Sequence, residues 1–348
     1  MGVQRMQIAV DAMGGDHGPS IVVPGAIQGA KTHGTDLILV GNPTQIQTAV
    51  NATDHTGVNI TIIESTEEIA MSEHPAQAVR RKPNNSISLA IKEIREGRAG
   101  AMVSAGNTGA VMAASLMILG RVPGIDRPAI ATYVPTSRGK SLILDLGAVT
   151  DPKPNNMVQF AIMGQVYAER VLELGNPTIG LLSNGEEATK GNQLVQQVYP
   201  MLESTPGIHF VGNVEGKDVA MGAVDIVVTD GFTGNVLLKT AEGVASLLTD
   251  LLRQELTRTL PRKLAAAFLR PAFRALRTKL DYAEIGGAPL LGVNGSVIIS
   301  HGRSNELAIA NAVGVAVRSA EHDLVGGIKA RVERAAAAAA AEEPVTVA

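Results

Sequence analysis

The sequence predicts an α/β protein in which helices cover both faces of a mainly parallel sheet. Short apolar runs of four to seven residues alternate along the chain with stretches whose apolar residues have helical spacing. Strands that alternate with helices in this way are typical of three-layer α/β/α architectures. The composition fits a large core, because 45% of the 348 residues are hydrophobic and only 18% are charged.

The expected strands and helices can be placed in order along the chain. Pro19 and Pro43 indicate helix starts, because proline is well tolerated in the first turn of a helix. The expected strands lie at residues 6–10, 37–40, 58–63, 101–103, 129–134, 141–144, 178–182, 208–211, 223–229 and 296–300. The expected helices lie at 21–32, after 43, at 86–96, after 109, at 155–174, up to 201, after 235 and up to 321.

We expect residues 1–325 to form a single domain and residues 326–348 to form a frayed helix or a disordered tail. The tail is rich in alanine and low in complexity, which is typical of such ends. The N-terminal apolar run is too short for a signal peptide, and no apolar stretch approaches the about 18 residues of a membrane-spanning helix. These features predict a cytoplasmic protein that does not cross a bilayer.

Charge and composition exclude several classes of function. The net charge of −3 argues against wholesale nucleic-acid binding. The chain has no cysteine, which excludes disulfides, thiolate–metal sites and a thioester formed on the protein. The histidines show no metal-ligand spacing, so we predict no metal and no other cofactor.

Five turns combine glycine with charged or amide residues where a strand is expected to meet a helix. Glycine allows tight turning, and the free N–H groups of a helix start bind anions. One such turn alone is more often an ordinary capped connection, but the turns of a parallel sheet are expected to meet at one edge. We therefore expect a phosphate or acyl phosphate site there. The turns cover residues 11–18, 104–109, 183–192, 230–235 and 301–305, and none contains a GxGxxG or P-loop nucleotide motif.

Residues 256–280 form a basic arm without a single acidic side chain. Apolar residues recur in it every three to five positions, and Pro261 and Pro271 are expected to break it into short helices. This pattern predicts contact with an anionic membrane or an acidic protein. A helical arm packed in a subunit interface is an equally good interpretation, and both can hold. The basic residues considered are Arg262, Lys263, Arg270, Arg274 and Arg277.

Several long motifs, in order, resemble one known family. They are DAMGGDHGP at 11–19, SAGNTGA at 104–110, GIDRPA at 124–129, LDLGA at 144–148, VTDGFTGN at 228–235, DYAEIGGAPLLG at 281–292 and HGRSN at 301–305. Together they are similar to the bacterial phosphate acyltransferase family, PlsX, from about residue 6 to residue 321.

The resemblance implies a specific reaction. The family moves a fatty acyl group from acyl carrier protein to inorganic phosphate. The acyl phosphate then feeds phospholipid synthesis through a membrane-bound glycerol-phosphate acyltransferase. The resemblance also implies a fold like that of isopropylmalate and isocitrate dehydrogenases, a homodimer, and peripheral association with the membrane.

Lys190, Asn235 and His301 are the candidate catalytic residues. Phosphate is already a charged nucleophile, so the reaction needs a held anion, a stabilised oxyanion and exclusion of water rather than a Ser-His-Asp triad. We expect Lys190 to hold phosphate, Asn235 to donate to phosphate or the oxyanion, and His301 to orient phosphate or protonate the departing thiolate. Without cysteine, phosphate is expected to attack the thioester directly. The candidate substrate-binding residues are Gly106, Asn107, Thr108, Gly109, Asp11, Asp16, Asp230 and Gly234.

The three aspartates of that set are expected to orient Lys190 or His301, or to cap their turns. The basic arm, together with Leu290 and Leu291, is a candidate wall for the acyl chain.

Two departures from the family pattern stand out. Val149 occupies the place of the usual asparagine in LDxGAN, and the segment LLSNGEEATKG at 181–191 differs from LLNIGxExxKG. Three rival functions stay open. They are a phosphotransacetylase-type enzyme that uses acyl-CoA, a metal-dependent β-decarboxylating dehydrogenase, and a non-catalytic scaffold that binds acyl chains at a membrane.

Overall fold

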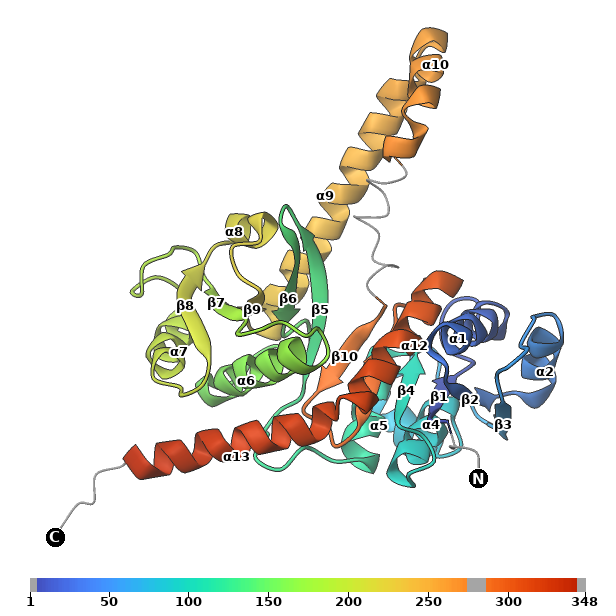
Figure 1. Cartoon of the computed structure of the whole chain (residues 1–348), viewed down its shortest axis with the longest axis horizontal. Coiled ribbons are helices and arrows are strands. Elements are labelled where there is room, and N and C mark those ends of the chain that lie inside the picture. The colour runs from blue at the N-terminus through green and yellow to red at the C-terminus, as the bar shows by residue number, and fades with distance from the viewer. Residues whose placement is uncertain (1–4, 274–285, 343–348) are drawn as a thin grey trace.

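The computed structural model describes residues 5–273 and 286–342, and these residues form an 11-stranded sheet with helices on both faces (Figure 1). The predicted α/β class with a mainly parallel sheet is confirmed. In spatial order the strands are β3 (Ile60–Glu64), β2 (Asp36–Gly41), β1 (Gln7–Asp11), β4 (Ala101–Ser104), β11 (Ser296–Ile299), β10 (Ala288–Leu291), β5 (Ala129–Thr136), β6 (Gly139–Leu144), β9 (Ile226–Val228), β7 (Thr178–Leu182) and β8 (His209–Val214).

The helices alternate with these strands along most of the chain. They are α1 (Pro19–His33), α2 (Pro43–Asn51), α3 (Pro75–Arg81), α4 (Ser86–Arg95), α5 (Thr108–Ile118), α6 (Pro154–Arg170), α7 (Gln193–Glu203), α8 (Gly216–Met221), α9 (Gly231–Thr257), α10 (Leu260–Phe268), α12 (Glu306–Glu321) and α13 (Leu324–Glu342).

The sheet consists of two parallel halves that run in opposite directions. Strands β3, β2, β1, β4 and β11 are parallel to one another, and so are β6, β9, β7 and β8. Between the halves, β10 pairs antiparallel with both β11 and β5, and β5 pairs antiparallel with β6. The expectation that all β-to-α turns share one edge of a parallel sheet is therefore wrong, because these antiparallel pairs reverse the strand direction.

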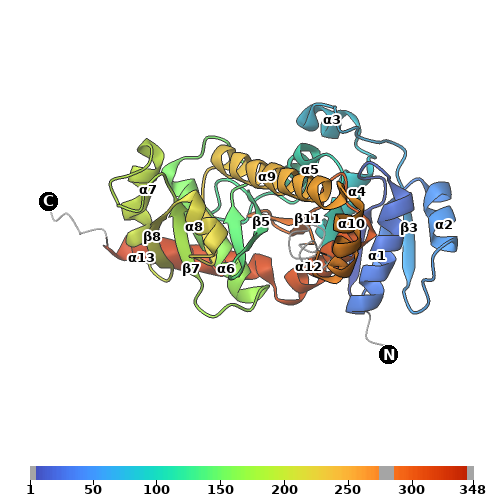
Figure 2. The same cartoon turned by 90° about the horizontal axis from the view of Figure 1, so that it is seen from above.

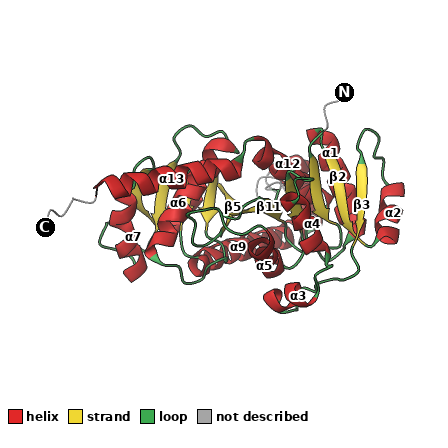
Figure 3. Cartoon of the chain, turned by 90° about the horizontal axis from the view of Figure 1, so that it is seen from below, coloured by secondary structure: helices red, strands yellow, loops and turns green. Residues whose placement is uncertain are grey.

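Three apolar clusters fill the layers. On one face, α1 and α12 cover the first half of the sheet and α6, α7 and α13 cover the second; α3, α4, α5 and α9 lie on the other face (Figure 3). Helices α1 and α12 approach closely because Gly25 and Gly29 have no side chain. A Cβ at Gly25 would lie 2.8 Å from that of Ile309, and one at Gly29 would lie 2.8 Å from that of Val313.

The two halves lie at opposite ends of an elongated molecule, with α2 at one end and α7 at the other (Figure 2). Residues 326–342, expected as a frayed or disordered tail, continue α13, and Ile328 and Val332 are buried in the same cluster as α6. Alanine-rich composition concealed these two apolar positions. Helices α3 and α8 and strand β10 were also not predicted, because each is short.

The first part of the basic arm extends a long helical hairpin. Helix α9 leaves the sheet, α10 folds back on it, and both rise away from the rest of the molecule (Figure 1). Of the 27 residues of α9, only Gly231 and Gly234 are buried, whereas Leu247 is 57% exposed. Among the described residues, no helix is both long enough and apolar enough to span a bilayer.

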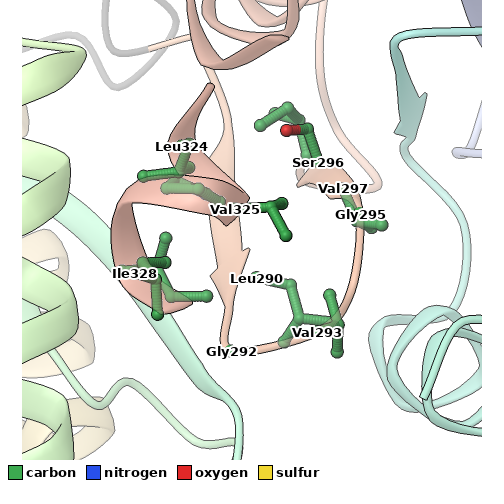
Figure 4. A pocket seen from close by; sticks show the side chains of 12 residues that line it. Leu290, Gly292, Val293, Gly295, Ser296, Val297, Leu324, Val325 and Ile328 are labelled. Carbon is green, nitrogen blue, oxygen red and sulfur yellow. The ribbon is translucent and has the colours of Figure 1, made fainter. Parts of the chain in front are cut away.

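Leu290 and Leu291 do not form an open wall for an acyl chain. Both lie on β10 in the middle of the sheet and are at most 2% exposed. A cavity of about 10 Å³ lies beside Leu290, against Leu324 and Ile328 (Figure 4). A space of this size has room for about one water molecule, not for an alkyl chain.

Candidate functional site

The turn after β4 is held by a buried aspartate on the neighbouring strand. Asp11 ends β1, and its carboxylate accepts a hydrogen bond of 2.7 Å from the Ser104 hydroxyl. That hydroxyl in turn accepts from the backbone N–H of Gly106 at 3.0 Å. Burial raises the pKa of Asp11, while the Ser104 hydrogen bond opposes the rise. Gly14 completes the contact, because a Cβ there would lie 2.7 Å from the Gly106 nitrogen.

Asn107 caps helix α5 and also binds a separate segment. Its side-chain oxygen accepts from the Ala110 N–H at 3.1 Å, as expected of an N-cap residue. Its amide nitrogen donates to the Met71 carbonyl at 3.1 Å and faces the carbonyls of residues 70 and 73 at 3.4 Å. The side chain predicted to hold phosphate is thus engaged in the structure. The N–H groups of Thr108 and Gly109 remain without intrahelical partners, because they open the helix.

His301 and Asp16 belong to this same group of turns. The Asp16 N–H donates to the Gly302 carbonyl at 2.8 Å, which ties the turn after β1 to the turn after β11. The His301 Nδ1 accepts from the Arg303 N–H at 3.1 Å. Residues 11–18, 104–109 and 301–305 therefore form one group, which we call the first turn group. It contains His301 and the candidate substrate-binding residues with numbers below 110.

A second buried aspartate, Asp145, follows β6 directly. One carboxylate oxygen accepts from the N–H groups of Ile130 at 2.9 Å, Leu146 at 2.7 Å and Ala148 at 3.2 Å. The other accepts from the Val149 N–H at 2.6 Å. Burial raises the pKa of Asp145, and these four backbone donors oppose the rise. Asp145 has no assigned role in the sequence analysis, although an aspartate between a buried strand and a glycine turn was a usable signal.

Helix α9 begins against this Asp145 loop. Its N-cap is Asp230, whose carboxylate accepts from the Thr233 N–H at 2.8 Å and the Thr233 hydroxyl at 2.7 Å. Asp230 therefore caps its helix, one of the two roles expected for it. Gly234 is required where it lies, because a Cβ there would come within 2.1 Å of the Asp145 carbonyl oxygen. Asn235 is exposed on the same turn, and its Cβ lies 4.0 Å from the Cβ position of Gly147.

The valine at position 149 uses its backbone where the family pattern has an asparagine. Its N–H binds Asp145, and its carbonyl accepts from the Gly231 N–H at 2.9 Å. Both bonds come from the main chain, so they do not depend on the side chain at residue 149.

Lys190 lies in an exposed turn between β7 and α7. The turn closes through the Lys190 N–H, which donates to the Glu187 carbonyl at 3.0 Å, and the Gly191 N–H, which donates to the Asn184 side chain at 2.8 Å. A Cβ at Gly185 would lie 2.7 Å from the Lys190 side chain. Within the described part of the chain, the ammonium group of Lys190 forms no ion pair.

The turns after β6, β7 and β9 form a second turn group, comprising residues 145–152, 183–192 and 230–235. They are joined by the contacts of Gly231 and Gly234 with the Asp145 loop, and by a common cavity of about 520 Å³. Lys190 and Asn235 thus belong to this group, whereas His301 and Asn107 belong to the first. Both groups border one apolar cluster, which includes Val111 of α5 and Leu237 of α9.

The described part of the basic arm carries three of its five candidate residues. Arg262 pairs with Glu255 at 2.7 Å. Lys263 and Arg270 are exposed, and the structure shows no ion pair for either within the described residues. Arg274 and Arg277 lie outside the described residues.

Three acidic side chains form a cluster with the spacing of a metal site. Carboxylate oxygens of Glu186, Glu215 and Asp218 lie within 4.8 Å of one another. Lys217 forms ion pairs with Glu186 at 3.7 Å and with Glu215, and Asp218 accepts from the Glu215 N–H at 2.9 Å. These internal contacts account for the cluster, and we assign no metal to it.

Comparison with known proteins identifies the family. Residues 6–326 match the family model described as "Fatty acid synthesis protein". A phosphate acyltransferase of Desulfitobacterium hafniense is 50% identical over 334 residues, which cover 96% of this chain and 99% of that protein. Another, from Heliobacterium modesticaldum, is 48% identical over 328 residues, which cover 94% of this chain and 98% of that protein.

The fold is shared with more distant proteins of known structure. A phosphotransacetylase from Streptococcus pyogenes superposes with a TM-score of 0.63 at 16% identity, covering 91% of this chain and 94% of that one. The EutD phosphotransacetylase from Staphylococcus aureus gives a TM-score of 0.60 at 14% identity, with the same coverage of both chains. The family match and the close relatives together show that this chain belongs to the fatty acid synthesis protein family that includes the bacterial phosphate acyltransferases.

Proposed function

We propose that the protein transfers a fatty acyl group from acyl carrier protein to inorganic phosphate and releases acyl phosphate. The observation that carries the proposal is the 50% identity, over 96% of the chain, to a protein named phosphate acyltransferase. The two turn groups support it, because they present helix starts, an exposed lysine and an exposed amide. These are the groups expected to bind an anion and to stabilise a developing oxyanion.

The reaction proceeds by direct attack of phosphate. A phosphate oxygen forms a bond to the thioester carbonyl carbon, and a tetrahedral oxyanion forms. Its collapse breaks the carbon–sulfur bond, and the sulfur leaves as a thiolate that takes a proton. Lys190 holds phosphate, the N–H groups of Thr108 and Gly109 contribute to the anion site, and Asn235 donates to the oxyanion. His301 orients phosphate or protonates the thiolate.

The helical hairpin of α9 and α10 supports a protein donor and a membrane-facing product. Lys263 and Arg270 are exposed on it, and an acidic carrier protein would be attracted to such groups. Its leucines are exposed over most of α9, and contiguous apolar surface of this kind marks contact with a second subunit or a membrane. We therefore include a homodimer, peripheral membrane contact and supply of acyl phosphate to phospholipid synthesis in the proposal.

The test uses purified protein with acyl carrier thioester and phosphate. We expect free carrier thiol and a product that hydroxylamine traps as a hydroxamate, both dependent on phosphate. Thiol release without phosphate would mean hydrolysis and would contradict the proposal. The same assay with acyl-CoA decides the alternative: a kcat/KM equal to or above that for the carrier protein would favour a phosphotransacetylase-type enzyme.

The hairpin has a separate test. The double variant Lys263→Glu, Arg270→Glu should raise the KM for acyl carrier thioester and leave the KM for acyl-CoA unchanged. The double variant Arg138→Glu, Lys140→Glu reverses two exposed charges at the turn between β5 and β6, outside α9 and α10, and serves as the control. If Lys263→Glu, Arg270→Glu changes neither the KM for acyl carrier thioester nor the fraction of protein that sediments with liposomes, the α9–α10 hairpin has no part in the proposed function.

A further inference from the structure

The turn that carries Lys190 is exposed along most of its length. Residues 186–190 are all exposed, and within them the Lys190 N–H closes a turn by donating to the Glu187 carbonyl at 3.0 Å. A surface loop of this kind has few packing contacts and opens readily unless other groups hold it. The place of the Lys190 ammonium group therefore depends on what holds the Glu187 carbonyl.

A buried amide on a neighbouring strand binds that same carbonyl. Asn213 lies on β8, the edge strand that pairs with β7 (Figure 1), and it is 7% exposed. Its side-chain Nδ2 donates to the Glu187 carbonyl at 2.8 Å. A carbonyl oxygen has two lone pairs, so it can accept from Asn213 and from Lys190 at once. In the described part of the chain, no other buried side chain forms a hydrogen bond to residues 186–190.

The other half of the Asn213 amide has no partner. Its Oδ1 is buried and forms no hydrogen bond with the described residues. A buried acceptor that is left unpaired costs stability, and an apolar side chain of similar size, such as leucine, would avoid that cost. A leucine could not supply the N–H group that reaches Glu187. The amide at position 213 is therefore explained by its bond to the turn and not by the packing of β8.

The stem of the Lys190 side chain is also held. Gly185 is buried, and a Cβ there would lie 2.7 Å from the Lys190 Cγ and 3.2 Å from the Lys190 Cβ. The stem thus packs against Gly185, and it starts from a backbone that the Glu187 carbonyl fixes. Because the first part of the side chain is placed before a ligand binds, holding an anion costs less conformational entropy.

We infer that Asn213 is a positioning residue for phosphate. Through the Glu187 carbonyl it sets the backbone of Lys190, and so the place of the ammonium group that holds the anion. This inference rests on the proposed function. Asn213 acts through Lys190 and makes no contact of its own with substrate. Its loss should therefore weaken phosphate binding and leave the use of the acyl donor unchanged.

The experiment compares Asn213→Ala with Gln165→Ala. Gln165, on α6, is a matched control, because its amide is also buried, donates to the Gly207 carbonyl at 3.0 Å just before β8, and leaves its own oxygen unpaired. Both variants lose buried hydrogen bonds, so both should be less stable than the wild type.

Only Asn213→Ala should raise the KM for phosphate. We expect a rise of about fivefold, the change that one lost hydrogen bond of ordinary net strength produces. Its kcat and its KM for the acyl donor should stay within about twofold of the wild type, because only ground-state binding of phosphate is weakened. An equal KM for phosphate in Asn213→Ala and Gln165→Ala would overturn the inference.

A double-mutant cycle separates positioning from general damage. In the Lys190→Ala background, adding Asn213→Ala should change kcat/KM for phosphate by less than about twofold, because the group that Asn213 places is already absent. A further fall of about fivefold in that background would mean that Asn213 acts by another route, and the inference would be wrong.

Two measurements without turnover keep the inference separate from the proposed function. Amide hydrogen exchange at Lys190 should be faster in Asn213→Ala than in the wild type and in Gln165→Ala. Calorimetry should show that Asn213→Ala binds inorganic phosphate about fivefold more weakly than the wild type. If the wild type forms no acyl phosphate and both differences are found, the proposed function fails and the role of Asn213 stands. If either difference is missing, the role of Asn213 fails, whether or not the wild type is active.

Should Asn213→Ala fail to fold, Asn213→Ser replaces it. Serine keeps a small polar side chain in the buried space, but its hydroxyl ends one bond short of the Asn213 Nδ2 and does not reach the Glu187 carbonyl. The same rise in the KM for phosphate and the same faster exchange at Lys190 are expected, and their absence would overturn the inference.

Discussion

Asp11 and Asp145 each lie at the carboxyl end of a buried strand, one in each half of the sheet, and each holds the turns beside it. Asp11 accepts from one backbone N–H, that of Met13, and reaches the Gly106 N–H only through the Ser104 hydroxyl. Asp145 acts on the main chain, because it accepts from four backbone N–H groups.

The difference shows which side chains each turn group leaves for a ligand. In the first group, Ser104 and Asn107 are engaged in holding the turn, so that group offers backbone N–H groups and the exposed side chain of His301. In the second group the main chain holds the loop, and Lys190 and Asn235 are exposed. The side-chain chemistry of the reaction should therefore depend more on the second group, and stability on both.

The largest expected effect tests that division directly. Lys190→Ala should lower kcat/KM for phosphate-dependent acyl transfer by about 100-fold, the loss typical of one removed donor to a developing charge. Its free energy of unfolding should stay within about 0.5 kcal/mol of the wild type, because the side chain is exposed. Lys140→Ala, also exposed, is the control for activity. A fall of less than about threefold in Lys190→Ala would show that the second group does not hold phosphate through this side chain.

Asp145→Ala should have the largest effect on stability. It leaves four backbone N–H groups, two of them buried and two partly buried, without their acceptor, and we expect a loss of about 3 kcal/mol in urea unfolding. Asp145→Asn keeps the shape and one acceptor oxygen, so its loss should be smaller. Asp250→Ala, on the exposed part of α9, should stay within about 0.5 kcal/mol. Equal stabilities of the two alanine variants would refute the role of Asp145.

Asn107→Ala should cost about 1–2 kcal/mol, because it removes the N-cap of α5. Asn305→Ala is the matched control, since Asn305 caps α12 through the Ala308 N–H at 2.9 Å. The Asn107 variant should in addition increase amide hydrogen exchange in residues 70–73, to which its amide donates. Unaltered exchange in residues 70–73 would mean that the hydrogen bond from the Asn107 amide to Met71 does not hold this segment in place.

The pH dependence of stability separates the buried carboxylate Asp11 from a surface one. Burial raises the pKa of Asp11 above 3.8, so the folded protein keeps a proton that the unfolded chain releases. The contribution of Asp11 to the free energy of unfolding therefore decreases as the pH rises above about 3.8, by at most about 1.4 kcal/mol per pH unit. The free energy of unfolding of Asp11→Asn should therefore increase relative to that of the wild type as the pH rises over that range. Asp145 also has a raised pKa, but it is present in both proteins and cancels in the difference.

Glu73 supplies a control of opposite sign. A hydrogen bond from Lys82 lowers its pKa below 4.5, so its contribution is lost as the pH falls through the lowered value. The difference in free energy of unfolding between Glu73→Gln and the wild type should shrink at low pH. In contrast, the free energy of unfolding of Asp11→Asn should increase relative to that of the wild type at high pH. Parallel curves for the two variants would contradict both assignments.

Val149→Asn should have the smallest effect. The backbone of residue 149 makes both of its hydrogen bonds in the Asp145 loop, so stability should change by less than about 0.5 kcal/mol and kcat/KM by less than about twofold. A gain in kcat/KM of tenfold or more would mean that the family's usual amide takes part in the reaction and that this chain has lost it.

Local patterns predicted the turns well, and long-range pairing explains most of what was missed. Gly106, Asn107 and Asp230 lie at helix starts as expected, because capping depends on residues a few positions apart. The reversal of the sheet could not be predicted, because it depends on β10, four residues that pair with strands from two distant parts of the chain. Asp145 differs, because only its Ile130 partner lies on another strand, whereas its other three partners are residues 146, 148 and 149, within reach of a local pattern.

Helix α9 begins at the turn that carries Asn235 and continues without interruption to Thr257, a length of about 40 Å. Because the helix is continuous, a contact that tilts its C-terminal end also tilts its first turn. A partner bound to the α9–α10 hairpin would therefore change the orientation of Asn235. Gly243, near the middle of α9, is the position where the exposed part of the helix has the lowest intrinsic helix propensity, because only proline is less favourable than glycine. Apart from the helix's own backbone, no described atom lies within 4 Å of a Cβ at that position, so no packing contact supports the helix there.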